Sequence, residues 1–235
     1  IAIGSGALGG ATHTTEYCVA IGHNTLASQT GDNVKNTAIG GLAGEAIAGG
    51  TENTLVGYRA GSAISGGNSN TAVGHDAYLA GTGTSNTIMG YAAGDAAMTG
   101  SHNVCLGSSA GSAITDGPGN VCIGSSAGVA MTTSDYNIAI GYQALDLLAT
   151  ASHNNIAIGS NALGGEDYSS SCIAIGANAL LVQNGVGGGS INLAIGTDAG
   201  KTISTGDMSV LVGHEAGMTV ADQNGTTAVG YWALK

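Results

Sequence analysis

The chain has 235 residues, of which 43 are Gly, one is Pro and none is Phe. A content of 43% hydrophobic and 8% charged residues excludes a disordered chain, and Gly without a three-residue period and with a single Pro excludes collagen. Four Lys and Arg against 15 Asp and Glu give a formal net charge of −11, which disfavours nucleic acid and anionic membranes as partners.

One short motif recurs from the start of the chain to its end: an apolar triplet, then Gly, two variable residues and Ala. The spacing is 16 to 18 residues, apart from one step of 20. We expect a single repeat domain over residues 1–235, folded as an all-β parallel β-solenoid in which each coil contacts only its neighbours. The chain starts and stops inside a repeat, so we also expect it to belong to a longer protein. The fourteen coils begin at residues 1, 19, 37, 54, 71, 87, 104, 121, 138, 156, 173, 193, 210 and 227.

The triplet that opens each coil has the composition of a short β-strand. Position 1 is Thr, Val, Ile or Leu, and position 3 is Ile, Val, Leu or Met in every copy. Because alternate strand residues point to opposite faces, we expect positions 1 and 3 to face the coil interior and position 2 to face outward.

Position 2 is never polar, which predicts a strand that is buried on both faces. An outward apolar stripe of this length needs a cover, and the same stripe on identical chains around a rotation axis is the economical one. We therefore expect parallel, in-register chains in a homotrimer. The predicted inter-chain seam consists of Ala2, Ala20, Ala38, Leu55, Ala72, Ile88, Cys105, Cys122, Ala139, Ala157, Ala174, Ala194, Leu211 and Ala228.

Position 4 is Gly in all fourteen copies. A sharp turn at one place in each coil needs a positive φ or a close backbone approach, and Gly supplies both. The predicted turn glycines are Gly4, Gly22, Gly40, Gly57, Gly74, Gly90, Gly107, Gly124, Gly141, Gly159, Gly176, Gly196, Gly213 and Gly230.

The rest of each coil is less regular. Position 7 is Ala in thirteen copies, position 8 alternates between Gly and Leu, and most coils carry an apolar residue at position 11. The residue before the triplet is Asn in nine of thirteen cases, which indicates turns and a ladder of stacked amides rather than a functional site. Polar segments between position 11 and this Asn predict surface loops, the longest at residues 185–190.

Two pairs of cysteines share repeat positions. Cys105 and Cys122 belong to consecutive coils, whereas Cys18 and Cys172 lie nine coils apart. Stacked strands hold equivalent atoms about 4.8 Å apart, further than the ~3.8 Å between the Cβ atoms of a disulfide. For Cys105 and Cys122 the spacing favours a ladder of thiols over a bridge.

Few carboxylates are placed as a catalytic pair would be. Asp198 and Glu215 share position 6 in consecutive coils, a separation of about 5 Å that suits a retaining glycosidase. The same column holds Arg59, which can pair with Asp76 at the surface. An exposed column explains these residues without a cleft, so we expect no enzymatic activity.

No metal or cofactor pattern stands out. The acids are scattered instead of repeating as in calcium-binding β-rolls, at Glu45, Asp95, Asp116, Asp135, Asp207 and Asp222. Histidines share position 5 or position 16 in separate coils and lack zinc-ligand spacing, at His23, His75, His102, His153 and His214. A three-His site on a threefold axis is the alternative to surface imidazoles.

Aromatic residues recur at position 5. Tyr58, Tyr91, Tyr142 and Tyr231 predict either a strip that stacks on sugars or packing beside the Gly turn. Trp232 is the single Trp and is expected to contact a following domain or cap.

The pattern Asn-Thr-Ala-Val-Gly-x-x-Ala at Asn70–Ala77, with variants at Asn36 and at Asn137–Leu145, resembles two related groups. One is the repeat shaft of bacteriophage tail fibres, and the other is the head β-roll of trimeric autotransporter adhesins, whose repeat is shorter. The resemblance covers nearly the whole chain. It implies a homotrimeric, extended fibre that links an anchor to a receptor-binding tip.

We therefore expect an extracellular structural segment of a phage tail fibre or a bacterial surface adhesin, without cofactor or membrane insertion. Two alternatives stay open: a module that itself binds cell-surface glycans, and a subunit of a self-polymerising filament. An ice-binding solenoid is less favoured, because Val, Ile and Leu interrupt the Thr residues at position 1.

Overall fold

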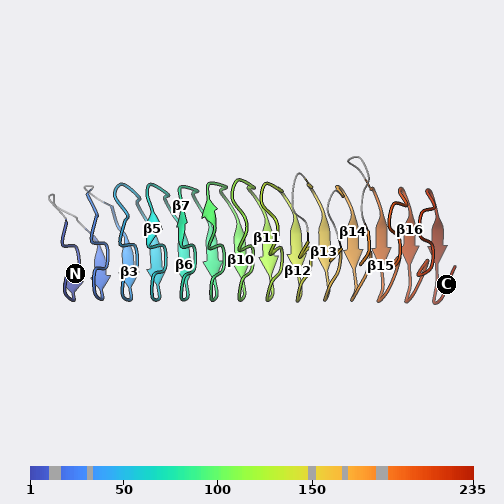
Figure 1. Ribbon diagram of the computed structural model, residues 1–235, viewed down its shortest axis with the longest axis horizontal. Helices are drawn as coiled ribbons and strands as arrows, with labels where there is room; N and C mark the ends of the chain where they lie inside the picture. Colours follow the sequence, from blue (N-terminus) through green and yellow to red (C-terminus); the bar gives the residue numbers. More distant parts are fainter. Residues whose placement is uncertain (11–16, 31–33, 148–151, 166–168, 184–189) are drawn as a thin grey trace. The chain divides into compact units, whose positions relative to one another are not determined.

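The computed structural model describes residues 1–10, 17–30, 34–147, 152–165, 169–183 and 190–235. They form an all-β parallel β-solenoid in which one short strand opens each coil (Figure 1). The opening strands are β1 (Ala2–Ile3), β2 (Val19–Ile21), β3 (Thr37–Ile39), β4 (Thr54–Val56), β6 (Thr71–Val73), β8 (Thr87–Met89), β10 (Val104–Leu106), β11 (Val121–Ile123), β12 (Ile138–Ile140), β13 (Ile156–Ile158), β14 (Ile173–Ile175), β15 (Leu193–Ile195), β16 (Val210–Val212) and β17 (Thr227–Val229). The predicted loop at 185–190 lies outside the described residues except for Ser190.

The chain forms two compact units, residues 1–116 and 117–235. In the first unit the opening strands follow the order β1-β2-β3-β4-β6-β8-β10, and in the second β11 to β17 follow one another. Within each unit the strands pair in parallel and in register, so that Thr37 pairs with Thr54 and Ile138 with Ile156. The first unit also carries a second small sheet, made of β5 (Ala63–Ile64), β7 (Ala80–Gly81) and β9 (Ala97–Met98).

The opening strands are oriented opposite to the sequence-based expectation. Position 2 faces the coil interior, and positions 1 and 3 face outward, as the alternating burial of β12 to β14 shows. The predicted seam is therefore wrong, because its side chains are already covered within a single chain. These side chains, at most 3% exposed, are Ala20, Ala38, Leu55, Ala72, Ile88, Cys105, Cys122, Ala139, Ala157, Ala174, Ala194, Leu211 and Ala228. Ala2, in the first coil, is exposed.

The narrow coil interior is the physical reason for the small residues at position 2. Position 8 lies across the interior from it, and a Cβ added at Gly61 would come within 2.8 Å of the side chain of Leu55. The two positions alternate in size: Leu55 faces Gly61, whereas Ala139 shares its coil with Leu145, and both leucines are fully buried. At these two positions a coil thus holds at most one large side chain, because two would overfill it.

Two coils carry small residues at both positions. Ala38 shares its coil with Gly44, and a Cβ at Gly44 would meet Leu26 at 2.8 Å and Leu55 at 2.9 Å. The large side chains of the coils on either side, together with Ile47 of the same coil at 3.1 Å, therefore fill the space. Interior packing extends across coils, which explains why the size rule is relaxed there.

The Asn before each triplet forms a buried polar column. The Oδ1 of Asn53 accepts from the backbone N–H of Asn70 at 2.9 Å, and the Nδ2 of Asn53 donates to the carbonyl of Gly67 at 2.9 Å. The same pair of bonds recurs at Asn70, whose Oδ1 accepts from the N–H of Asn86. Each amide thus joins its own coil to the next and satisfies backbone groups that would otherwise be buried without partners.

The position 4 glycines have φ values between 127° and 143°. A Cβ at Gly141 would lie 2.5 Å from the carbonyl oxygen of Gly159 in the next coil. Conformation and close approach therefore both require Gly at this turn.

Candidate functional site

The outward face of the opening strands recurs in every coil of each unit. In the second unit it consists of positions 1 and 3 of β11 to β17, fourteen side chains of which all but Thr227 are aliphatic. Most are half-buried by their neighbours on adjacent strands, while Ile195 and Val210 are each 38% exposed. The thirteen aliphatic residues are Val121, Ile123, Ile138, Ile140, Ile156, Ile158, Ile173, Ile175, Leu193, Ile195, Val210, Val212 and Val229.

The corresponding face of the first unit is more mixed. Position 3 is aliphatic or Met throughout, but position 1 is Thr in the four strands β3, β4, β6 and β8. Ile39 and Met89 are 39% and 43% exposed. Neither unit carries a charged side chain in these two columns.

The apolar area of this face is large for a lone chain. Complete burial of an aliphatic side chain removes about 100 Å², so the thirteen partly exposed residues of the second unit present on the order of 500 Å². For comparison, each partner contributes ~800 Å² to a standard protein interface. The face of the second unit is therefore as large as the largest apolar patches of monomeric proteins, which are often functional.

Sequence reasoning missed this face because it placed positions 1 and 3 inside. The size alternation between position 2 and position 8 was the signal that pointed to the correct orientation. Only residues that share one interior would compensate each other in volume.

The position 5 aromatics of the first unit form a stacked column. The ring centroids of Tyr58 and His75 are 5.1 Å apart, and those of His75 and Tyr91 are 5.5 Å apart. Tyr58 and Tyr91 are 49% and 61% exposed. Beside them the predicted pair forms, with the Nε of Arg59 3.3 Å from the Oδ1 of Asp76. The rings of neighbouring members are tilted against each other by 42° and 31°.

A second aromatic group lies at the end of the second unit. Tyr231 stacks between His214 and Trp232, with centroid distances of 5.4 Å and 4.7 Å. The Nζ of Lys235 lies 3.8 Å from the centre of the Trp232 ring and 2.6 Å from an oxygen of Glu215. Trp232 therefore packs against its own chain and remains 48% exposed. Tyr142 is exposed and Ser125 and Ser160 occupy its column in the adjacent coils, so the column is interrupted there.

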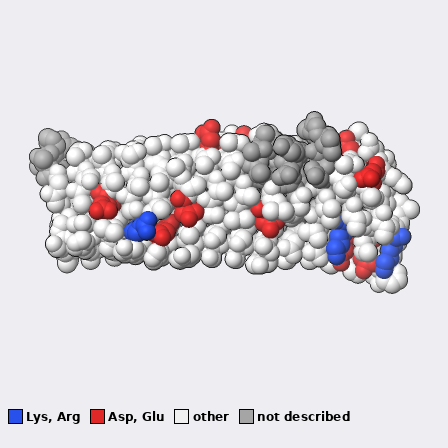
Figure 2. Space-filling model, viewed as in Figure 1, with Lys and Arg blue, Asp and Glu red and all other residues white. Residues whose placement is uncertain are grey.

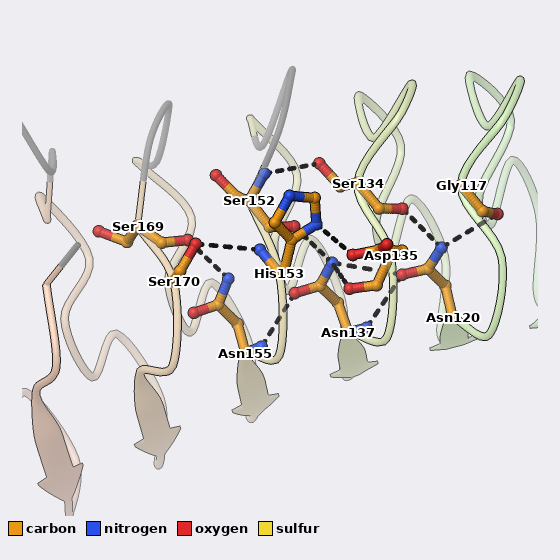
Figure 3. Close-up of polar contacts among 10 residues, drawn as sticks. All are labelled: Gly117, Asn120, Ser134, Asp135, Asn137, Ser152, His153, Asn155, Ser169 and Ser170. Carbon is orange, nitrogen blue, oxygen red and sulfur yellow. Dashed lines mark hydrogen bonds and ion pairs between the residues drawn. The ribbon is translucent and has the colours of Figure 1, made fainter. Parts of the chain in front are cut away.

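Figure 3 shows the polar column of the second unit around His153. The Nδ1 of His153 contacts the Oδ1 of Asp135 in the preceding coil, and its backbone N–H donates to Ser170 at 3.1 Å. Beneath them the amides of Asn137 and Asn155 continue the buried column (Figure 3). These contacts join neighbouring coils, as the bonds of the Asn column do.

His102 and His153 do not share a column, contrary to the sequence-based assignment. Counted from the following triplet, His102 stands two residues before Val104 and has φ +63°, whereas His153 stands three residues before Ile156. The coil that begins at Ile138 is one residue longer than the coil that begins at Thr87. Position 16, counted from the start of the coil, therefore corresponds to different places before the next triplet in the two coils.

Both members of the candidate carboxylate pair contact neighbouring basic side chains. Partial burial raises the pKa of Asp198, but hydrogen bonds from Asn178 and Lys201 and the charge of Lys201 outweigh it and bring the pKa below its usual value. Glu215 binds Lys235 and His214. A general acid needs a raised pKa, so the lowered pKa of Asp198 does not suit that role.

The remaining candidate groups act within the solenoid. Asp116 accepts from Thr99, and Asp222 accepts from Ser204 and Thr205, which lowers the pKa of Asp222. Among the described residues no three His, Cys, Asp or Glu side chains gather as metal ligands. All four cysteines are buried free thiols.

The part of the chain that the structure describes contains no helix with the length and apolarity that a membrane crossing requires. Comparison with known proteins finds no family model, no curated protein and no solved structure that matches this chain.

Proposed function

We propose that this protein is a structural segment of an extracellular fibre, in which identical chains associate in parallel as a homotrimer through the outward face of their opening strands. The fibre projects a receptor-binding tip from a phage tail or a bacterial surface. The uncharged aliphatic face of positions 1 and 3 is the observation that carries the proposal. The repeat pattern, which resembles tail-fibre shafts and adhesin heads, supports the setting.

The periodicity of the face favours a copy of the same chain as its cover. A partner that contacts every coil must repeat with the same rise of about 4.8 Å, and an identical parallel chain does so in register. The distribution of charge also favours the outward columns as the interface between copies. A chain of net charge −11 repels its copies, and the outward columns are free of charged side chains, whereas acidic residues lie elsewhere on the surface, several of them beside Lys or Arg (Figure 2).

One matched pair of substitutions tests this interface. Ile158→Lys places a charge in the outward columns, whereas Ser160→Lys places the same charge in the same coil at an exposed position outside them. Burying an unpaired ammonium group in an interface costs several kcal/mol, so we expect Ile158→Lys to yield folded single chains and Ser160→Lys to leave the assembly intact. Native mass spectrometry reports the assembly and circular dichroism the fold. Equal masses for the two variants would contradict the proposal.

The exposed aromatic column of Tyr58, His75 and Tyr91 favours a second candidate function, binding of cell-surface glycan. Its exposed rings and the neighbouring Arg59–Asp76 pair offer both apolar and polar contacts. Binding of the protein to a glycan array, lost in Tyr91→Ala, supports this function, and a blank array supports a purely structural segment.

A further inference from the structure

A hollow of about 300 Å³ lies beside the position 1 column of the outward face of the second unit. Its apolar lining comes from three consecutive position 1 residues, Ile173, Leu193 and Val210, together with Ile191 and Met208. The last two stand two residues before their triplets, and each is 61% exposed. The aliphatic face is therefore wider here, by one column, than the two columns that run along the rest of the unit.

The residue two before the triplet is polar, Gly or Tyr in the other described coils. The comparable residues are Tyr17, Lys35, Glu52, Ser69, Ser85, His102, Gly119, Tyr136, Asn154, Ser171 and Gly225. Ile191 and Met208 are thus the two aliphatic members of this column, and they occupy adjacent coils.

The backbone also departs from its repeat at Ile191. In the other coils the residue two before the triplet has a positive φ, which is +55° at both Tyr136 and Met208. The N–H of Tyr136 donates to a carbonyl of the preceding coil. Ile191 is not in that conformation, which β-branched residues avoid, and its N–H donates at 3.1 Å to the carboxylate of Asp207 in the following coil. The hollow therefore marks one place along an otherwise repetitive surface.

A repetitive face leaves the axial alignment of neighbouring copies poorly specified. If one copy slips by a single coil, position 1 and position 3 residues of one chain still meet aliphatic residues of the other, because nearly every coil of the second unit presents Ile, Val or Leu. Alignment must then depend on a feature that does not repeat.

We propose that the hollow is a register lock between copies of this chain: it receives an aliphatic side chain from the outward face of a neighbouring copy and fixes which coils face each other. This inference rests on the proposed self-association. The occupant is a second copy because the hollow borders the uncharged outward columns, and an identical parallel chain matches the one-coil repeat of those columns. In the part of the chain that the structure describes, Ile191 and Met208 are each 61% exposed.

Cross-linking between copies measures the register. Chains with Ile138→Cys and chains with Ile156→Cys, which carry the new thiol in adjacent coils, are assembled together and oxidised, and peptide mass spectrometry separates same-site from mixed-site disulfides. The native cysteines are buried in the coils and do not compete. With the hollow intact we expect same-site products to dominate. The double substitution Ile191→Ser and Met208→Ser should keep the oligomer mass and raise the mixed-site fraction by about threefold or more.

Tyr136→Ser is the matched control, because Tyr136 occupies the same column and is 60% exposed. It should leave the mixed-site fraction unchanged. An unchanged fraction in the double variant overturns the lock. Dissociation of the double variant also overturns it, because the hollow would then hold the copies together rather than align them. A parent protein that is a single chain by mass refutes the self-association itself, which the mass measurement reports separately.

Methionine oxidation gives a second readout that needs no substitution. In the assembled protein we expect peroxide to spare Met208 although it is 61% exposed in the lone chain, while the half-buried Met218, which lies outside the outward columns, is oxidised. Oxidation of Met208 as fast as Met218 in an oligomer would show an open hollow and contradict the inference.

Discussion

At the scale of single residues, the fold depends on volume inside a very narrow coil. Position 2 and position 8 face each other, and the coil accommodates one large side chain of the two. Ala at position 2 is therefore a packing requirement of the chain itself and says nothing about contacts with other chains. The outward columns are free of this restriction, which is why β-branched residues gather there.

A reciprocal exchange tests this volume rule. Ala139→Leu alone should lower the free energy of unfolding by about 1–3 kcal/mol because it overfills the coil that holds Leu145. Adding Leu145→Gly should restore much of that loss, since the pair then has the same residues as Leu55 and Gly61 and position 145 already has φ +51°. Urea unfolding of both single variants and the double variant gives the coupling free energy. Additive losses would contradict the facing arrangement.

Tyr78 predicts a pH dependence of stability. Burial raises the pKa of Tyr78 to about 12, against hydrogen bonds with Asn86 and Gly83 that lower it. In the unfolded chain the hydroxyl ionises near its ordinary pKa of 10.0, so its contribution to stability is complete below pH 10 and is lost as the pH rises through about 12. The contribution of the hydroxyl is measured by comparing the thermal unfolding of the parent with that of Tyr78→Phe between pH 10 and about 12. If the unfolding temperatures of the parent and of Tyr78→Phe changed in parallel with pH, the raised pKa of Tyr78 would be contradicted.

At the scale of elements, a triplet strand cannot be stable by itself, and stacking on identical strands supplies the missing contacts. The buried Asn column links successive coils beside each strand. Its bonds run from side chain to backbone, so they stabilise the turn of one coil and the start of the next together.

Removing one amide from this column should be costly. Asn70→Ala leaves the backbone N–H of Asn86 without its acceptor. It also removes one of the two hydrogen bonds that the carbonyl of Gly83 accepts, while the bond from the hydroxyl of Tyr78 remains. We expect a loss of about 2–4 kcal/mol in the free energy of unfolding, measured with urea. Asn70→Ser should lose less, because Ser209 in the same column accepts from the N–H of Thr226. Equal losses would show that the acceptor does not matter.

The repeat made the solenoid, the strand positions and the sharp Gly turns predictable, because each depends on a residue type that recurs at one position. The direction of the strand was not predictable from the triplet alone, since the triplet is apolar on both faces. Only the partner across the interior, position 8, decides between the two orientations. The hollow could not be predicted from the sequence either, because nothing but the fold shows that Ile191 and Met208 lie beside Leu193 and Val210.

At the scale of the whole molecule, a solenoid chain has a core that is complete inside each coil and an apolar face that is not covered. The position 2 side chains of a lone chain are buried, so its interior needs no partner. The outward columns remain partly exposed in both units, and we attribute their aliphatic composition to the association of copies.

The mass of the unmodified protein in solution tests the central claim most directly. Sedimentation equilibrium over a range of concentrations should give three times the 22.5 kDa of one chain, with no dissociation in the micromolar range. A stable, soluble particle of one chain at all concentrations would contradict the account, because the outward aliphatic face would then be a free surface.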